Sequence, residues 1–200
     1  MKRRKATQGR APQSPRVPTR LQEESFRELV EGCVRAARLG LYGTWYRGVR
    51  FAPGARPTRR DMGLPPPERC AAGRFNRKGD CVLYLARTLE AVEAEVDPEP
   101  GRPVLFVQRY DVDLPDVRVL ERPRRGPLAW AWAQADQRAT VEEDYALTHL
   151  LADALREARI DAVVYESDES AGDGPQNLAL LGAAARRAEG MAVGDPSPFP

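Results

Sequence analysis

The chain has 200 residues with 31 basic and 29 acidic side chains, a length that accommodates one domain with a buried core. No apolar run approaches the ~20 residues of a membrane-spanning helix, and the basic N-terminus lacks the hydrophobic stretch of a signal peptide. The three cysteines form no CxxC pair, so we expect a cytoplasmic protein without a disulfide framework or a zinc site.

The first twenty residues differ from the rest of the chain in charge. They hold seven of the 31 basic residues and no acid, which leaves 24 basic against 29 acidic residues, a net charge of −5. Prolines and a lack of apolar side chains predict a disordered basic arm over residues 1–20. The arm is either a solvated tail or a weak contact for nucleic acid or an acidic partner. Residues 186–200 are also predicted to be a tail, so the folded domain is predicted over residues 21–185.

The folded part is predicted to mix helices and strands. Residues 53–72 contain five prolines and form a long loop, either a functional lid or a disordered segment. The run 81–86 is apolar on both faces, which is typical of a central strand. Periodicity predicts the other elements: helices over 24–39, 88–97 and 142–157, and strands beginning at Trp45 and over 104–112, 161–167 and 177–182, with a loop over 118–125.

The helix over 88–97 places one carboxylate in an unusual position. Leu89 and Val92 share its apolar face, whereas Glu90 and Glu93 point into water. Glu95 falls at the edge of the apolar face, where a carboxylate loses hydration. Such a glutamate either pairs with a nearby arginine or has a functional use.

Neighbouring segments supply further polar groups. The turn at Gly79, the strand and the helix edge can bring Arg74, Tyr84 and Glu95 to one side of a sheet. The single histidine, His149, is expected to point into solvent. This disfavours histidine-dependent catalytic triads and multi-histidine metal sites.

Three ordered blocks of residues resemble the RES domain family, which occurs in bacterial toxins that degrade NAD. The first block is the pair Tyr46-Arg47. The second is Gly73-Arg74-Phe75-Asn76, then Gly79, the strand Tyr84-Leu85-Ala86, and Glu95. The third is Tyr165, Ser167, a loop containing Gly174, and Asn177 with the apolar strand that follows it. Glu166 stands where the family has a proline.

The resemblance implies a single-domain α+β fold with a mixed or split sheet, similar to the ADP-ribosyltransferase fold. It also implies cleavage of the bond between nicotinamide and ribose, with NAD as the substrate and no separate cofactor or metal. The implied roles are catalysis by Glu95, phosphate or ribose binding by Arg47 and Arg74, a nicotinamide pocket shaped by Tyr46 and Tyr84, and orientation of the ribose and the arginines by Ser167 and Asn177.

These residue types suit that reaction. Nicotinamide in NAD is already a cationic leaving group, so its departure needs no general acid. The positive charge that develops on the ribose is stabilised by a fixed carboxylate. Arginine forks bind the diphosphate, and an aromatic ring stacks on nicotinamide. The stretch from Gly172 to Gly174 is too short for a dinucleotide-binding fingerprint, so the NAD site is not expected to be a Rossmann site.

The resemblance also implies a partner, and two rival functions stay open beside it. The usual partner in this family is a helix-turn-helix antitoxin, and the acceptor of the ribosyl group is water or phosphate. One rival is an ADP-ribosyltransferase that modifies a macromolecule. Another is a non-enzymatic module that binds nucleic acid through the basic arm, for which the chain offers no supporting signature.

Deleting residues 1–20 tests the role of the basic arm. The deletion removes no predicted site or core residue, so NAD turnover should stay within roughly a factor of two of the full-length rate. Salt-sensitive binding to nucleic acid, measured by a filter or fluorescence assay, should weaken. A truncated protein that folds but cannot cleave NAD would show that the arm is part of the active site.

Overall fold

The described chain alternates helices and strands. The computed structural model describes residues 19–70, 75–96, 101–121, 145–166 and 176–199. None of the helices in these ranges is both long and apolar enough to cross a membrane. The elements in chain order are α1 (Thr19–Ala36), β1 (Arg38–Phe51), η1 (Pro67–Arg69), β2 (Val82–Ala86), α2 (Leu89–Glu95), β3 (Val104–Glu121), α4 (Tyr145–Glu157), β4 (Ala162–Glu166), β5 (Gln176–Leu181), α5 (Gly182–Glu189) and β6 (Ala192–Pro198).

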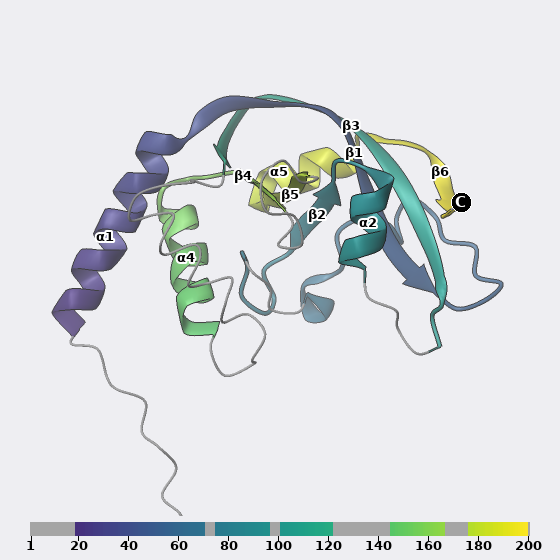
Figure 1. Cartoon of the computed structure of the whole chain (residues 1–200), viewed down its shortest axis with the longest axis horizontal. Helices are drawn as coiled ribbons and strands as arrows, with labels where there is room; N and C mark the ends of the chain where they lie inside the picture. The colour runs from purple at the N-terminus through teal and green to yellow at the C-terminus, as the bar shows by residue number, and fades with distance from the viewer. Residues whose placement is uncertain (1–18, 71–74, 97–100, 122–144, 167–175, 200) are drawn as a thin grey trace, which may run out of the picture.

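Six strands form one mixed sheet in the order β1-β2-β5-β4-β3-β6. Only the β3–β4 pair is parallel among the described strands. Because β1 also pairs with β3, five strands close into a ring and β6 adds to its outside. The long strands β1 and β3 arch together over the shorter ones (Figure 1). The predicted α+β class with a mixed sheet is confirmed, and its likeness to ADP-ribosyltransferases stays a prediction.

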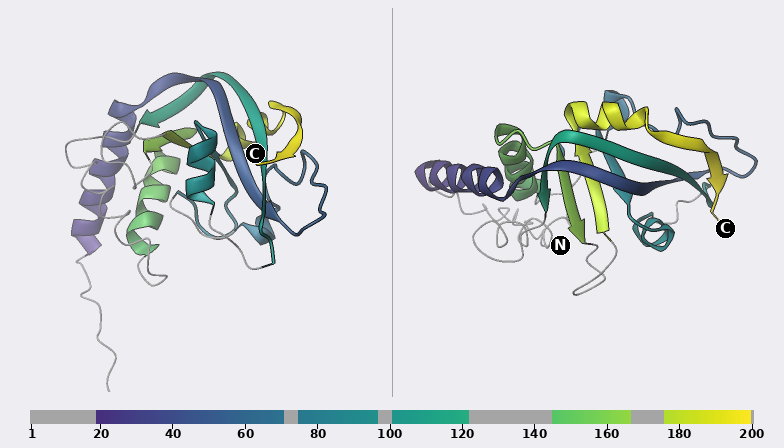
Figure 2. Two further views of the ribbon diagram at one scale, coloured as in Figure 1. Left: turned by 45° about the vertical axis from the view of Figure 1, so that its right-hand side comes forward. Right: turned by 90° about the horizontal axis from the view of Figure 1, so that it is seen from above.

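Side chains alternate across the strands, so the sheet has two apolar faces. One face packs against α1 and α4, which lie side by side at one end of the molecule (Figure 2), and against α2. The other face packs against three buried alanines of α5. Strand β2 contributes to both faces, with Val82 toward α4 and Leu83 and Leu85 toward α5, as expected for a central strand.

Strand β3 is much longer than its sequence pattern indicates. The predicted strand over 104–112 continues through Pro115 to Glu121, so residues 118–121 are strand and not the loop expected there. The β1–β3 register shifts between Leu39 and Leu41, opposite residues 114–118. Proline is tolerated there because an irregular stretch of a ladder does not need every backbone N–H.

The C-terminal segment is part of the sheet and not the tail that was predicted over 186–200. Strand β6 pairs with β3, with Val193 opposite Arg109 and Pro198 opposite Phe106. The buried Gln108 donates from Nε2 to the carbonyls of Val193 and Gly194 at 2.9 and 3.3 Å. Strand β6 is held largely by backbone pairing, which explains why its polar composition suggested a tail. Residues 1–18 of the predicted arm lie outside the described ranges, and α1 begins at Thr19.

The absence of a side chain at Gly48 lets α2 lie directly on β1. A Cβ atom at this position would overlap Val92 Cγ1 and would come within 3.1 Å of Leu105 Cδ1 and Val96 Cγ2. All three side chains belong to one apolar cluster between α2 and the sheet, in which Val92 is buried.

Gly48→Ala should therefore displace α2 and lower the free energy of unfolding by about 1–3 kcal/mol, the usual effect of overpacking. Denaturant unfolding measures the change. Gly190→Ala is the matched control, because its added Cβ would come no closer than 3.5 Å to the Arg187 carbonyl oxygen. Equal stability of the two variants would show that α2 adapts without strain.

Candidate functional site

A row of side chains crosses the four central strands on the face that carries α2. Tyr46 of β1 lies opposite Ala86 of β2, Ala86 lies opposite Asn177 of β5, and Asn177 lies opposite Tyr165 of β4. Directly paired residues project from the same face of a sheet. Tyr84 lies two residues before Ala86 and shares this face. Tyr46, Tyr84 and Asn177, three of the predicted site residues, are thus on one side of the sheet.

Helix α2 adds the fourth predicted residue, Glu95. The Thr88 hydroxyl caps the helix by accepting from the Ala91 backbone N–H at 3.2 Å, two residues after β2 ends. Buried Val92 presses the helix onto the sheet. At the end of α2, Asn177 donates from Nδ2 to Glu95 Oε1 at 2.6 Å. The chain thus brings Glu95 to the row of strand residues.

Glu95 is exposed as a residue, so the loss of hydration predicted for a position at the edge of the buried face is wrong. Its position is instead set by Asn177, which is only 2% exposed. The second amide atom, Asn177 Oδ1, is buried and has no hydrogen-bond partner among the described residues. An unpaired buried acceptor is unfavourable until a water molecule or a ligand donates to it. The Glu95 carboxylate is therefore held beside Asn177 Oδ1, an acceptor that a ligand can use.

Asn76 holds Tyr84 in place. The Tyr84 hydroxyl donates to Asn76 Oδ1 at 2.9 Å, and the Asn76 amide donates from Nδ2 to the carbonyls of Arg77 and Asp80 at 3.1 and 3.0 Å. Asn76 is 3% exposed. It belongs to the Gly-x-Arg-Phe-Asn motif but is absent from the predicted site residues. Only its place in that motif could have indicated a role in the site. Asparagine is common in turns, so a single asparagine in a turn does not by itself predict a functional residue.

Arg47 lies on the opposite face of the sheet from Glu95. It follows Tyr46 directly in β1, so the two side chains point in opposite directions. Burial lowers the pKa of the Arg47 guanidinium, and the nearby Tyr110 and Glu189 oppose this shift by favouring its charged form. The Nη1 atom of Arg47 is buried and has no hydrogen-bond partner within the described part of the chain. The structure thus does not bring Arg47 to the other predicted site residues.

The loop after β1 also covers the opposite face, as far as it is described. Tyr110 donates its hydroxyl to the Met62 carbonyl at 2.9 Å, and Met62 is fully buried. The Leu64 backbone N–H donates to Glu189 Oε1 at 2.7 Å. These contacts attach residues 62–64 to β3 and α5, so this part of the loop is not a lid over Glu95.

Two predicted site residues, Arg74 and Ser167, lie outside the described ranges, as do the side chain of His149 and the loop that contains Gly174. Among the residues that are described, no group of three or more His, Cys, Asp or Glu side chains is arranged to hold a metal ion.

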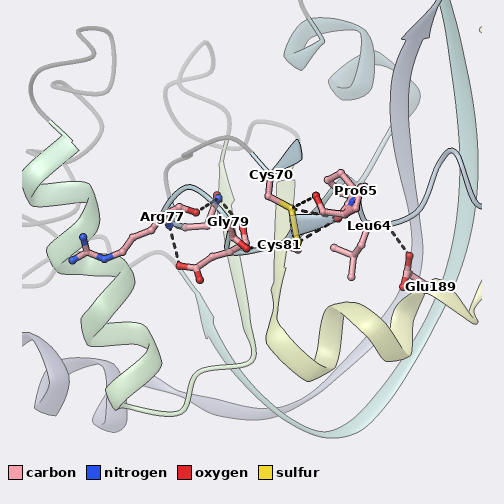
Figure 3. Close-up of a disulfide and its surroundings, with 10 residues drawn as sticks. Leu64, Pro65, Cys70, Arg77, Gly79, Cys81 and Glu189 are labelled. Atoms are coloured by element: carbon pink, nitrogen blue, oxygen red, sulfur yellow. Dashed lines mark hydrogen bonds between the residues drawn. A yellow bond between two sulfur atoms is a disulfide. The ribbon is translucent and has the colours of Figure 1, made fainter. Parts of the chain in front are cut away.

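The structure joins Cys70 and Cys81 in a disulfide, which corrects the expectation drawn from the cysteine spacing (Figure 3). Their Cα atoms are 5.6 Å apart, and the Gly79 backbone N–H donates to the Cys70 carbonyl at 2.9 Å. The two cysteines are 11 residues apart in the sequence, a spacing that matches no recognised pairing motif. The backbone hydrogen bond from Gly79 to Cys70 holds the two ends of this segment together.

A sequence profile of the RES domain matches residues 44–200. The chain belongs to the RES domain family. Among solved structures, its fold is similar to that of a chain in the crystal structure of the M.tuberculosis MbcT–MbcA toxin–antitoxin complex. The TM-score is 0.58 at 15% identity, over 88% of this chain and 93% of that chain, a level that shows a shared fold. No curated protein sequence matches the chain.

The match to the RES domain extends beyond the predicted boundary at residue 185 and includes all of β6. It begins within β1, so α1 precedes the matched region. Helix α1 nevertheless packs on the domain, because Leu29 and Cys33 share a buried cluster with Leu151 and Leu155 of α4.

The charge balance around Arg47 in the RES domain can be tested by a double-mutant cycle. Glu189→Gln keeps the acceptor for Leu64 but removes the negative charge. It should lower the free energy of unfolding by about 1–2 kcal/mol, less than the ~3–5 kcal/mol for breaking a fully buried pair, because Glu189 is exposed. Arg47→Met should change stability by less than about 1 kcal/mol, because it removes a buried charge and preserves the packing.

Denaturant unfolding of the double variant decides the test. In the Arg47→Met background, Glu189→Gln should have almost no effect. Glu121→Gln, which removes the negative charge from the exposed 2.8 Å pair with Arg38, is the control for loss of a surface charge. An equal effect of Glu189→Gln in both backgrounds would show that the two charges do not interact.

Proposed function

We propose that this RES domain cleaves the bond between nicotinamide and ribose in NAD. The observation that carries the proposal is the hydrogen bond of 2.6 Å from Asn177 to Glu95. It fixes one carboxylate oxygen, while Oε2 has no hydrogen-bond partner among the described residues. A pre-positioned carboxylate of this kind is suited to a positive charge that appears only in the transition state.

In the proposed reaction, the electron pair of the N-glycosidic bond moves onto the nicotinamide ring, which leaves as a neutral molecule. The ribose C1′ becomes electron-deficient, and the carboxylate of the exposed Glu95 stabilises it. Water or phosphate then bonds to C1′. With water, the products are nicotinamide, ADP-ribose and one proton. With phosphate, the second product is ADP-ribose phosphorylated at C1′.

The residues around Glu95 have complementary proposed roles. Tyr84 and Tyr46 share the sheet face with Asn177, and their rings offer surfaces for the flat nicotinamide. Asn177 Oδ1, which has no partner in the part of the chain that the structure describes, can accept from a ribose hydroxyl or from the nicotinamide amide. Arg74 and Ser167 keep their proposed phosphate-binding and ribose-orienting roles from the family motif.

Arg47 is assigned a different role from the one expected from the sequence. Its buried guanidinium lies behind β1, beside Tyr110 and Glu189. We propose that it supports the strand that presents Tyr46 and does not bind the diphosphate. Arg74 is then the arginine proposed to bind phosphate.

We further propose that the protein acts as the toxin of a toxin–antitoxin pair, inhibited by a helix-turn-helix antitoxin. The fold similarity to a chain of a toxin–antitoxin complex supports this proposal, as does the acidic body, which offers a complementary surface to a basic partner. Such a toxin would act on cytoplasmic NAD.

The decisive experiment incubates the purified protein with NAD labelled in the adenylate half, with and without phosphate, and identifies the products. Release of nicotinamide with labelled ADP-ribose or its phosphate supports the proposal and names the acceptor. Label retained on a macromolecule supports the transferase alternative. If a protein that is shown to be folded leaves NAD unchanged, the proposed enzymatic function is rejected.

Glu95→Gln should reduce kcat/KM for NAD on the order of 10²-fold, by loss of one electrostatic transition-state contact. The amide keeps the shape and can still accept from Asn177, so the fold should be unchanged by circular dichroism. Glu93→Gln is the control on the same helix, because Glu93 is also exposed. Near-normal turnover in the folded Glu95 variant would reject the mechanism.

A further inference from the structure

We propose that Cys70 and Cys81 form a reversible thiol–disulfide site that reacts with low-molecular-weight disulfides and controls the placement of Tyr84. The proposal that this alters turnover rests on the proposed NAD cleavage. The redox chemistry and its effect on the turn between the cysteines can be measured without NAD.

The two ends of the disulfide border the segment that holds Tyr84. Cys81 directly precedes β2, and Tyr84 is three residues further along the strand. Asn76, which accepts from the Tyr84 hydroxyl at 2.9 Å, lies between the two cysteines in the sequence. A covalent bond from Cys70 to Cys81 therefore closes the ring of residues that contains Asn76.

The surroundings suit both oxidation states. The Sγ atoms of Cys70 and Cys81 are each 3.3 Å from the Pro65 carbonyl oxygen (Figure 3). Thiol groups can donate weakly to a carbonyl, so this oxygen is an acceptor for the reduced cysteines. Their Cα separation of 5.6 Å is within the range that a disulfide spans without movement of the backbone. The two states can thus interconvert on nearly the same backbone.

Exposure indicates which sulfur reacts first. Cys81 is half-buried, whereas Cys70 is only 6% exposed. An external disulfide can therefore reach Cys81 more easily. The third cysteine is an internal control, because Cys33 is fully buried and burial raises the pKa of its thiol to about 11. A protonated, inaccessible thiol does not enter exchange.

The external disulfide is the oxidant, and it accepts the two electrons that the two cysteines lose. The Cys81 thiolate attacks one sulfur of the oxidant, forms a mixed disulfide and releases one small thiolate. The Cys70 thiolate then attacks Cys81 Sγ, which forms the internal bond and releases the second small thiolate. The protein loses two protons and two electrons, and the oxidant becomes two thiols. Excess small thiol reverses both steps.

Reduction should loosen the turn without unfolding the domain. Other contacts still hold it: the backbone hydrogen bond from Gly79 to Cys70, the ion pair of Arg77 with Asp153, and the 2.7 Å pair of Arg156 with Asp80. Of these, the two ion pairs are partly exposed and therefore weak. We expect Asn76 to lose part of its fixed position and Tyr84 to lose part of its support.

The first experiment follows the thiols by alkylation and mass spectrometry under native conditions, with oxidised glutathione as the probe. The reduced wild type should lose the mass of two hydrogen atoms and retain one unreactive cysteine. Cys70→Ser should keep one glutathione on Cys81, whereas Cys81→Ser should react more slowly. A wild type in which Cys70 and Cys81 both remain free thiols, or that accumulates a stable glutathione adduct, would overturn the proposal.

The second experiment compares the oxidised and reduced wild type by hydrogen–deuterium exchange and by NAD kinetics. Exchange should be faster over residues 75–80 after reduction, and kcat/KM for NAD should fall by roughly tenfold because a positioning contact is weakened. The Cys70→Ser/Cys81→Ser variant should match the reduced enzyme and should not respond to glutathione. Cys33→Ser should respond as the wild type does.

The outcomes distinguish this proposal from the proposed function. Identical exchange over 75–80 in both oxidation states would overturn the control of Tyr84, whatever the enzyme turns over. Equal kcat/KM in an active enzyme would overturn it as well. If no NAD is cleaved in either state, a redox-dependent change in exchange still supports the site, and the failure belongs to the proposed NAD activity.

Discussion

The hydrogen bond from Asn177 to Glu95 connects a short helix to the centre of the sheet, and the candidate site depends on it. Helix α2 has seven residues, fewer than a helix needs for stability on its own. Its place is therefore set by its contacts: the cap at Thr88, the packing of Val92 and the amide of Asn177. Because Asn177 is buried in a strand paired on both sides, the carboxylate has a rigid reference point.

The two faces of the sheet have different roles, and two consecutive residues of β1 project from opposite faces. Tyr46 projects toward α2, whereas Arg47 projects toward α5 and Tyr110. A buried guanidinium is unfavourable unless other charges compensate for it. The nearby Glu189 provides that charge and also binds Leu64, so the same carboxylate attaches the loop after β1. One face thus presents the candidate chemistry while the other stabilises the ring of strands.

Much of the site was predictable from local patterns. The apolar run of β2 on both faces indicated a central strand, and alternation placed Tyr84 on one face of it. Helical periodicity separated Glu95 from the exposed Glu90 and Glu93, although the loss of hydration inferred for it was wrong. The order of the motif pointed to Asn177. The inferences about Tyr84 and Glu95 needed only the period of a strand or a helix, which each sequence segment carries by itself, whereas Asn177 came from the resemblance to the family.

The sequence by itself therefore determined most of the helices and strands, the central strand and the set of candidate polar groups. Only the tertiary structure decided which of them meet. The face chosen by Arg47, the disulfide of Cys70 with Cys81, and the pairing of β6 with β3 all depend on contacts between distant segments. The alternation of side chains along a strand shows that Tyr46 and Arg47 project from opposite faces of the sheet. It does not show which helix covers each face. That choice is made by packing, because the burial of apolar surface depends on the whole set of neighbours.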